Sequence, residues 1–368
     1  MPILRGGWPS QGLPKGAMWR AALLALLLAG CATPPVAETL PGPFTRPGPA
    51  QPLSVRPCPA PPAPLTTLMS EPFYTDGAFS VPDPARLAAD TEASRPLREW
   101  LDAMQRPTER WVALRDPAQA DCALRQLEAW AEGRALLGAF NRQGGYHRKW
   151  ALSGAAIAYL ALRDAPAATQ ERQARIGAWM AEVARPVAAF YDRPPPRQPQ
   201  ATSELLNNHI AWAGLAVAAS GVAAGDRALL RRGMEFGETF LAQVTPEGAH
   251  PQELARGRLA LHYHLFALQA AAALARIGEA AGEPLSPAGR AALDRFARFT
   301  HAQALDPSRI AALTGAAPAR LTGDRPWLAE AHGIEVWARD PAIRATLQPF
   351  RPYRARWLGG GVTLLWGG

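Results

Sequence analysis

The chain has 368 residues and a formal net charge of +8, and this length suits either one large domain or two ordinary ones. Arg5, Lys15 and Arg20 precede Cys31 without any acidic residue, so a chain that begins at Cys31 carries +5. That charge is moderately basic and not histone-like, and it favours an anionic polymer or a membrane surface as partner.

The N-terminal stretch MWRAALLALLLAGCATPP predicts an export signal. One positive charge at Arg20 precedes an apolar run, residues 21–29, that is too short to span a bilayer. The LAGC sequence that ends at Cys31 resembles the lipobox of bacterial lipoproteins, which implies cleavage before Cys31 and its acylation. We therefore expect residues 1–31 to be a signal peptide that starts at Met18. The mature chain is expected to be a periplasmic monomer tethered to the outer membrane by its lipid, where nucleic acid is an improbable partner. A plain secretory signal with an incidental cysteine is the alternative.

Residues 32–65 carry a proline every few positions, which predicts a semi-extended tether between the anchor and a domain over residues 66–368. Export places Cys58 and Cys122 in an oxidising compartment, so we expect a disulfide between them and not a metal pair. This bond would attach the end of the tether to the fold.

Residues 90–305 follow a helical pattern, with apolar residues three or four apart and almost no strand-like alternation. Nearly all-apolar segments begin near Trp150, Ile210 and Leu259, and amphipathic segments alternate with them. Short turns that contain Gly or Pro separate the pairs. We therefore predict an all-α fold in which helical hairpins form an (α/α) toroid or incomplete barrel, with a groove at the starts of its inner helices. An open solenoid is the alternative.

Two of the apolar segments begin with polar side chains. NNHIAW places Asn208 and His209 at the head of one, and QELARGRLALHYHLFAL (252–268) places Arg256 and Tyr263 at the head of the next. Arg256 and Tyr263 are seven residues apart, which on a continuous helix puts them on one face, about 10 Å apart along the axis. All four side chains are then expected to face the groove. The competing reading is that the Asn caps its helix and that the His and Tyr are core residues with satisfied hydrogen bonds.

These four residues suit β-elimination at a uronic acid, because the C5 proton is only weakly acidic until the neighbouring carboxylate is neutralised. Asn208 and His209 can donate hydrogen bonds to that carboxylate, and Arg256 adds a positive charge. Tyr263 can move the proton, provided that nearby cations lower its pKa from the ordinary value of about 10.

This chemistry needs no cofactor, and we expect no metal site. His262 and His264 diverge by about 200° around a helix, and the chain contains no HExxH motif.

At these residues the chain resembles the alginate lyases of polysaccharide lyase family 5, periplasmic enzymes that cut polymannuronate-type uronans by β-elimination. The resemblance covers most of the globular part and is carried by FYTDG (73–77), HRKWAL (147–152), NNHIAW (207–212), QELARGRLALHYHLFAL (252–268) and WLGGGVT (357–363). It implies an incomplete (α/α) barrel with a lid loop near the N-terminus that closes over an anionic polysaccharide.

By position, the resemblance makes Asn208, His209 and Arg256 the neutralisers of the substrate carboxylate, with His209 also available as a base for one epimer. It makes Tyr263 the acid and base. Tyr74 in FYTDG matches a tyrosine of the lid loosely and is a candidate for substrate binding.

Three further residues near the inner helix starts are candidates for substrate contact. Trp212 either packs below the site or stacks on a sugar. Arg148 and Lys149 would by default be solvated, but Lys149 is the only lysine after the signal and lies beside an inner helix start, so it is a candidate to contact a substrate carboxylate.

Two departures from the family pattern concern the choice of substrate. Family members often read RGQRAL or RRQRAL where this chain has RGRLAL (256–261), so the second arginine, Arg258, is displaced by one position, about 100° around a helix. His262 stands where small or polar residues are common. We expect both changes to alter which uronan fits.

Three other functions are open at the level of sequence. One is a lyase for polyglucuronate or another glucuronic acid polymer. A glycoside hydrolase on the same toroid would need two opposed carboxylic acids, for which Glu204 and Glu253 are the only acids beside the motifs. Both stand where acids commonly precede a helix. The third is a tethered protein that binds or assembles an exported polysaccharide without cleaving it.

Overall fold

The computed structural model describes residues 38–44, 57–194 and 202–367, all within one compact unit, Glu38–Gly368. The predicted signal peptide with Cys31, and most of the predicted tether, lie outside the described residues. Among the helices that are described, none is both long enough and apolar enough to cross a membrane.

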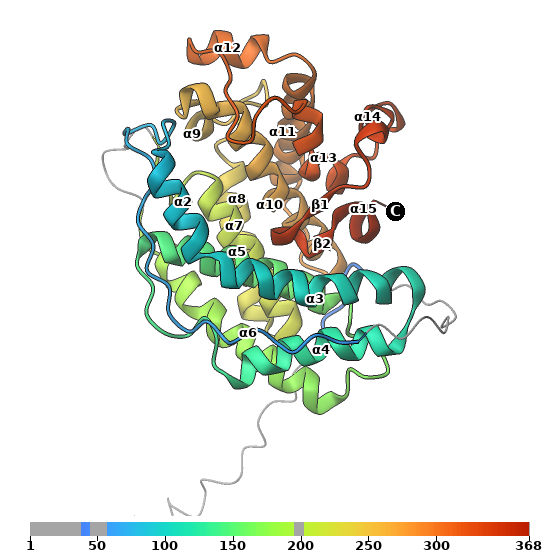
Figure 1. Cartoon of the computed structure of the whole chain (residues 1–368). Helices are drawn as coiled ribbons and strands as arrows, with labels where there is room; N and C mark the ends of the chain where they lie inside the picture. Colours follow the sequence, from blue (N-terminus) through green and yellow to red (C-terminus); the bar gives the residue numbers. More distant parts are fainter. Residues whose placement is uncertain (1–37, 45–56, 195–201, 368) are drawn as a thin grey trace, which may run out of the picture. The chain divides into compact units, whose positions relative to one another are not determined.

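The unit is built almost entirely of helices (Figure 1). Its first part contains α2 (Pro84–Ala93), α3 (Arg95–Leu114), α4 (Pro117–Glu132), α5 (Arg142–Leu160), α6 (Gln170–Tyr191), α7 (Asn208–Ala224) and α8 (Arg227–Leu241). Its second part contains α9 (Pro251–Leu254), η1 (Gly257–Leu259), α10 (Ala260–Ala280), α11 (Pro287–Leu305), α12 (Ser308–Thr314), η2 (Trp327–Glu330), α13 (His332–Trp337), α14 (Pro341–Leu347), η3 (Gln348–Phe350), η4 (Arg356–Leu358) and α15 (Val362–Trp366). Two short antiparallel strands, β1 (Arg354–Ala355) and β2 (Gly360–Gly361), pair with Arg354 opposite Gly361.

The inner helices are α5, α7 and α10. Helices α7 and α10 begin close to the predicted starts at Ile210 and Leu259, whereas α5 begins at Arg142, well before the predicted Trp150. Helix α7 is buried along almost its whole length and contacts α5, α6, α8 and α10, because its Ala-rich sequence is apolar on every face. The partners α6 and α8 have a buried face and an exposed, charged face. The prediction of an all-α fold with inner apolar and outer amphipathic helices is therefore confirmed.

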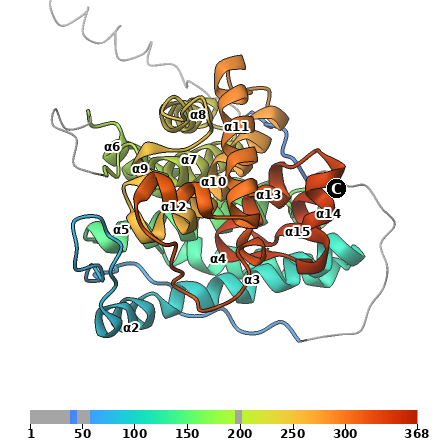
Figure 2. The same ribbon diagram turned by 90° about the horizontal axis from the view of Figure 1, so that it is seen from above.

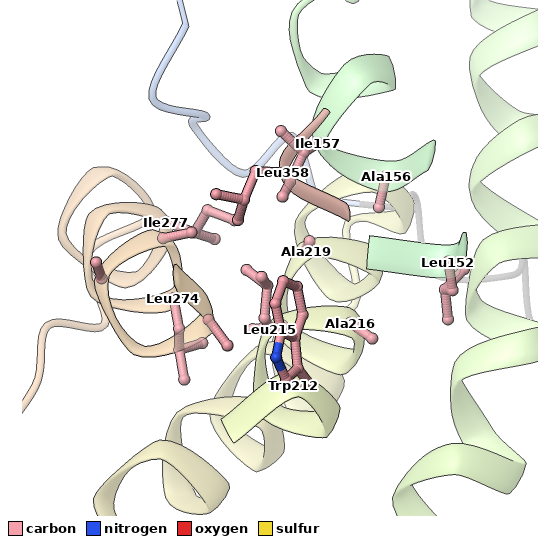
Figure 3. Packing of buried hydrophobic residues seen from close by; sticks show 14 of the residues in the cluster. Leu152, Ala156, Ile157, Trp212, Leu215, Ala216, Ala219, Leu274, Ile277 and Leu358 are labelled. Carbon is pink, nitrogen blue, oxygen red and sulfur yellow. The ribbon is translucent and has the colours of Figure 1, made fainter. Parts of the chain in front are cut away.

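Small residues let the inner helix α7 pack closely against its outer partner α8. A side-chain Cβ on Gly233 of α8 would lie 2.5 Å from the carbonyl oxygen of Gly214 in α7, so these two backbones touch only because both positions are Gly. On the other faces of α7, side chains from α5, α7, α10 and the C-terminal segment converge to form the core (Figure 3), among them Leu152, Ala156, Ile157, Trp212, Leu215, Ala216, Ala219, Leu274, Ile277 and Leu358.

Residues 38–44 already pack against the helical unit, although the domain was predicted to begin at residue 66. Leu40 and Phe44 are buried in the core, and Phe44 lies edge-on against Trp366 with 4.7 Å between ring centroids. Cys58 forms the predicted disulfide with Cys122 of α4. The predicted domain boundary at residue 66 is therefore too late, because apolar and cysteine side chains in the proline-rich stretch bind to the helices.

The C-terminal elements close the unit beside α3, where α15 contacts both α3 and α13 (Figure 2). Trp327, Trp337 and Trp366 are buried in the core. Trp357 is half-buried, and its ring centroid lies 6.1 Å from that of Trp150.

Candidate active site

A cavity of about 210 Å³ opens at the heads of α5, α7 and α10. It is closed on one side by the loop that contains Tyr74 and Phe79, and Leu321 also reaches it. The predicted residues Asn208, His209, Arg256, Tyr263 and Tyr74 all line it. Its other lining residues are Pro72, Phe73, Phe79, Arg142, Gln143, Tyr146, Trp150, Thr202, Glu204, Asn207, His262, Phe266 and Leu321.

The head of α7 is fixed by two asparagines with different functions. Asn207 is the N-cap, and its side chain accepts a hydrogen bond from the backbone N–H of His209. Asn208 is the first helical residue and is fully buried, and both its backbone N–H and its side-chain amide donate to Glu253 of α9. The capping interpretation therefore holds for Asn207 only.

Glu253 is fully buried, and this burial raises its pKa to about 7 although the nearby Arg256 lowers it. Its carboxylate is occupied by Asn208 and is absent from the cavity lining. Glu204 does line the cavity, where it accepts hydrogen bonds from Tyr146 and Arg142. Glu204 and Glu253 therefore do not form the opposed pair of acids that a glycoside hydrolase needs.

His209 lies on the cavity wall and is held by neighbours from α5. Its ring stacks on Tyr146 with 3.9 Å between centroids, and its Nδ1 atom lies 2.8 Å from the Nζ of Lys149. Burial, reinforced by the positive charges of Lys149, Arg256 and Arg142, holds the pKa of His209 well below its usual value of 6.5. The imidazole is therefore neutral at neutral pH.

Lys149 does not reach the cavity, contrary to the prediction that it touches the substrate. It is almost fully buried, and its Nζ donates to the hydroxyl of Tyr191 at 2.6 Å. At its position on α5 the side chain points between α6 and α7, so it contacts His209 and not the ligand space.

Arg256 precedes α10 and is not part of it, which corrects the prediction of one continuous helix. Gly257 adopts a positive φ of 53°, and this left-handed residue starts the short turn η1 before α10 begins at Ala260. With this turn between them, the Cζ of Arg256 lies only 3.7 Å from the centre of the Tyr263 ring. Arg258 lies in the same turn, so its predicted 100° displacement around a helix does not apply.

The guanidinium of Arg256 is buried and forms no ion pair with a carboxylate among the described residues. Its Nε atom and the Oδ1 atom of Asn208 are buried without a hydrogen-bond partner there. Uncompensated buried polar groups are costly, which favours a site that binds an anionic, polar ligand.

Tyr263 is the second half of a tyrosine pair. Its hydroxyl lies 2.5 Å from that of Tyr74. Burial raises the pKa of Tyr263, whereas Arg256 and the hydrogen bond to Tyr74 act in the opposite direction. At neutral pH Tyr263 is therefore a phenol in the unliganded protein, and it can donate a proton.

The loop that carries Tyr74 is internally braced. Asp76 accepts hydrogen bonds from the backbone N–H groups of Ser80 and Val81 and from the Ser80 hydroxyl, each at 2.8 Å. Tyr74 is bridged to Pro82, so the loop closes on itself and holds the phenol over the cavity. This arrangement fits a lid loop.

The aromatic wall of the cavity contains residues that the sequence analysis missed. Gln143, Tyr146 and Trp150 come from one face of α5, and Asp90 holds Gln143 through a hydrogen bond of 3.0 Å. Their spacing of three and four residues in RQGGYHRKWAL is the signal that could have identified them. Trp212 is fully buried below this wall.

Trp212 packs against Phe266 with 4.9 Å between ring centroids. Of the two predicted positions for Trp212, packing below the site is therefore the correct one.

A second cavity of about 410 Å³ adjoins the first and shares Arg142, Tyr146 and Glu204 with it. Arg148 lines this second cavity and lies over the Phe140 ring, with its Cζ 4.7 Å from the centroid. It forms no ion pair with a described carboxylate, and burial lowers its pKa. Arg148 is thus brought near the site, but into a different hollow from the other predicted residues.

His262 and His264 point in different directions, as their spacing predicts. His262 lines the cavity with its Nδ1 atom 3.5 Å from Glu330, whereas His264 is buried and bonded to the Ala260 carbonyl. No cluster of three metal-ligating side chains occurs among the residues that the structure describes.

Comparisons with known proteins agree with this geometry. The family model described as alginate lyase matches residues 67–310. A polysaccharide lyase of Stenotrophomonas maltophilia is 33% identical over 84% of this chain and 90% of its own length, and an alginate lyase of Pseudomonas fluorescens is 31% identical over 83% of each.

Solved structures show the same fold. A variant of alginate lyase A1-III complexed with tetrasaccharide superimposes with a TM-score of 0.68 at 21% identity, covering 86% of this chain and 88% of that one. The crystal structure of alginate lyase A1-III from Sphingomonas species A1 gives a TM-score of 0.64. The chain therefore belongs to the alginate lyase family of polysaccharide lyases.

Proposed function

We propose that the protein cleaves a mannuronate-rich polyuronate, alginate, by β-elimination. The observation that carries the proposal is the convergence of Asn208, His209, Arg256 and Tyr263 on one cavity, with the guanidinium of Arg256 buried and without an ionic partner among the described residues.

In this reaction the carboxylate of the uronate sits against Arg256, Asn208 and His209. The electrons of the C5–H bond form the C4=C5 double bond, the C4–O4 bond breaks, and O4 takes up a proton. Negative charge grows on the carboxylate as the C5 proton leaves, so preorganised donors in a buried site stabilise the transition state more than the ground state. The reaction creates a 4,5-unsaturated sugar end.

Tyr263 transfers the protons. Removal of the C5 proton requires the phenolate of Tyr263, which Arg256 and the Tyr74 hydroxyl favour. The phenol formed in that step then returns a proton to O4. No cofactor is needed, because every group that the step uses belongs to the chain.

The test is incubation with polymannuronate and measurement of the ultraviolet absorbance of unsaturated ends. We expect product from the wild type, unchanged activity in the presence of a chelator, and loss of at least about 10²-fold in Tyr263→Phe, with polymer binding retained. A panel of uronans identifies the substrate: preference for polyglucuronate would replace alginate, and binding without unsaturated product from any uronan would overturn the lyase proposal.

We also propose that Cys31 is acylated and holds the enzyme at the periplasmic face of the outer membrane. Support comes from the LAGC sequence and the proline-rich stretch behind it. In Cys31→Ser the protein should leave the membrane fraction and become soluble in the periplasm. Unchanged membrane association of that variant would contradict the proposal.

A further inference from the structure

Lys149 is a buried cation enclosed by three helices. Its Nζ atom lies 2.6 Å from the Tyr191 oxygen of α6, 2.8 Å from the Nδ1 of His209 in α7, and 4.3 Å from the ring centroid of Tyr146 in its own helix. An ammonium group has three N–H donors and no acceptor. The three neighbours offer a hydroxyl oxygen, an imidazole nitrogen and an aromatic face, which is one acceptor for each donor.

This geometry decides which nitrogen of His209 carries the proton. Since a lysine ammonium can only donate, Nδ1 must present its lone pair to Lys149, and the hydrogen of the neutral ring is then on Nε2. A neutral amine can also accept a hydrogen bond from an Nδ1–H group while it donates to Tyr191, so it is the ammonium form that fixes the Nε2–H tautomer. The Nε2 atom forms no hydrogen bond with another described residue, and the ring lines the cavity.

We propose that Lys149 is a positioning residue that locks His209 in the Nε2–H tautomer, so that His209 donates a hydrogen bond to the substrate carboxylate and cannot serve as a base. The inference rests on the proposed function and deepens it for the same site. It assigns the work of proton abstraction to Tyr263 alone.

The charges around the pair support a neutral imidazole. Arg142 and Tyr146 face it from α5, Tyr191 from α6, Glu204 from the segment before α7, and Arg256 from the turn after α9. Lys149, Arg142 and Arg256 together oppose a further positive charge on His209.

Burial also changes the pKa of Lys149 itself. It lowers the pKa of Lys149 well below 10.5, while Glu204 acts in the opposite direction. Arrival of an anionic sugar at His209 favours the ammonium form, which strengthens the hydrogen bond to Nδ1.

The test is nitrogen NMR of the full-length, 15N-labelled protein, with the His209 ring signals identified by their loss in His209→Ala. We expect a bare Nδ1 and a protonated Nε2 in the wild type from pH 8 to pH 5. A protonated Nδ1, or a mixture of both tautomers, would overturn the proposal. This readout needs no substrate, so it separates failure of the tautomer lock from failure of the alginate assignment.

The variant Lys149→Met removes the donor and keeps an unbranched side chain that is one atom shorter. We expect both tautomers of His209, titration of its ring closer to 6.5, and a fall of kcat/KM by about tenfold or more, with a new loss of activity below that pH. Unchanged kcat/KM across the pH range in a folded Lys149→Met variant would contradict the inference.

Two further variants control for disturbance of the helix packing. Ser153→Ala removes a buried hydroxyl one turn further along α5, where it donates to the Trp150 and Trp357 carbonyls and does not line the cavity. It should leave the tautomer and the activity unchanged. Tyr191→Phe retains Lys149 beside His209, and its NMR spectrum should still show the Nε2–H form. Loss of the Nε2–H form in Ser153→Ala would show that helix packing in general, and not the hydrogen bond from Lys149, sets the tautomer, and it would overturn the proposal.

Discussion

Glu253 accepts hydrogen bonds from both nitrogens of one residue, Asn208: its Oε1 atom lies 2.5 Å from the backbone nitrogen, and its two oxygens lie 3.1 Å and 3.3 Å from the side-chain nitrogen. The two contacts join α9 to the head of α7, although the residues are 45 positions apart. The Oδ1 atom of the Asn208 amide has no hydrogen-bond partner among the described residues. Glu253 thus orients a binding residue without touching the cavity itself.

Replacement of Glu253 by Gln should change how stability depends on pH. Burial raises the folded-state pKa of Glu253 from 4.5 to about 7, so its favourable contribution is fully present below pH 4.5 and is lost as pH rises through 7. Between pH 5 and pH 8 the wild type should lose up to about 3 kcal/mol of unfolding free energy relative to Glu253→Gln. Urea unfolding at both pH values measures this difference, and parallel pH dependences would contradict it.

Removal of the Tyr74 hydroxyl should shift the pH profile of the enzyme. The hydrogen bond from Tyr74 lowers the pKa of Tyr263 against the effect of burial, so Tyr74→Phe should raise that pKa further. Because the phenolate is the base, kcat/KM should rise with pH above 7, and the rise should move to higher pH in the variant. Phe79→Leu, in the same loop and without a hydrogen bond to Tyr263, should keep the wild-type midpoint whatever its rate. Identical profiles for Tyr74→Phe and the wild type would count against Tyr263 as base.

Arg148 should bind the carboxylate of a sugar beyond the cleavage point, because it lines the second cavity without an acidic partner among the described residues. In Arg148→Gln we expect KM for long polyuronates to rise about tenfold, the effect of one charge-assisted hydrogen bond. The KM for a trimer should stay unchanged. Arg125→Gln on the exposed face of α4 is the matched control for lost charge. An equal effect on long and short substrates would refute a separate sugar site.

Acid should destabilise the fold through two buried histidines. Burial lowers the pKa of His250 to about 3 and that of His264 to about 4, below the ordinary value of 6.5. As pH falls from 6.5 toward 4, these histidines take up protons in the unfolded chain but stay neutral in the folded chain. The free energy of unfolding therefore falls by up to about 1.4 kcal/mol per pH unit for each histidine. Thermal unfolding across this range should show the fall, and His250→Phe should make it shallower. An unchanged slope in that variant would exclude His250 as a contributor.

The order and type of the helices were predictable, whereas the behaviour of the N-terminal stretch was not. The apolar segment after Ile210 has the composition of a fully buried helix, and that pattern is local. By contrast, Leu40 and Phe44 are isolated apolar residues among prolines, and only their tertiary contacts reveal that they belong to the core. A local pattern cannot report contacts between residues hundreds of positions apart.

The candidate site was predictable to the level of residues but not of contacts. Asn208, His209 and Tyr263 could be identified from the sequence because they are polar residues near the starts of apolar helices. Polar side chains on buried helices are expected to face a common cavity. The position of Arg256 above the Tyr263 ring depends on the left-handed backbone of Gly257, which spacing on an ideal helix cannot anticipate. The burial of Lys149 was equally hidden, since a lysine on α5 is expected to be solvated until its neighbours from α6 and α7 are known.

The left-handed backbone of Gly257 separates Arg256 from helix α10, so the position of Arg256 does not follow the periodicity of that helix. An exchange at the exposed Arg258 alters a short turn and leaves the guanidinium of Arg256 against the Tyr263 ring. A change at the exposed Arg258 is therefore expected to cost the reaction little. The one-residue offset of Arg258 is therefore a weak indication of a different substrate preference.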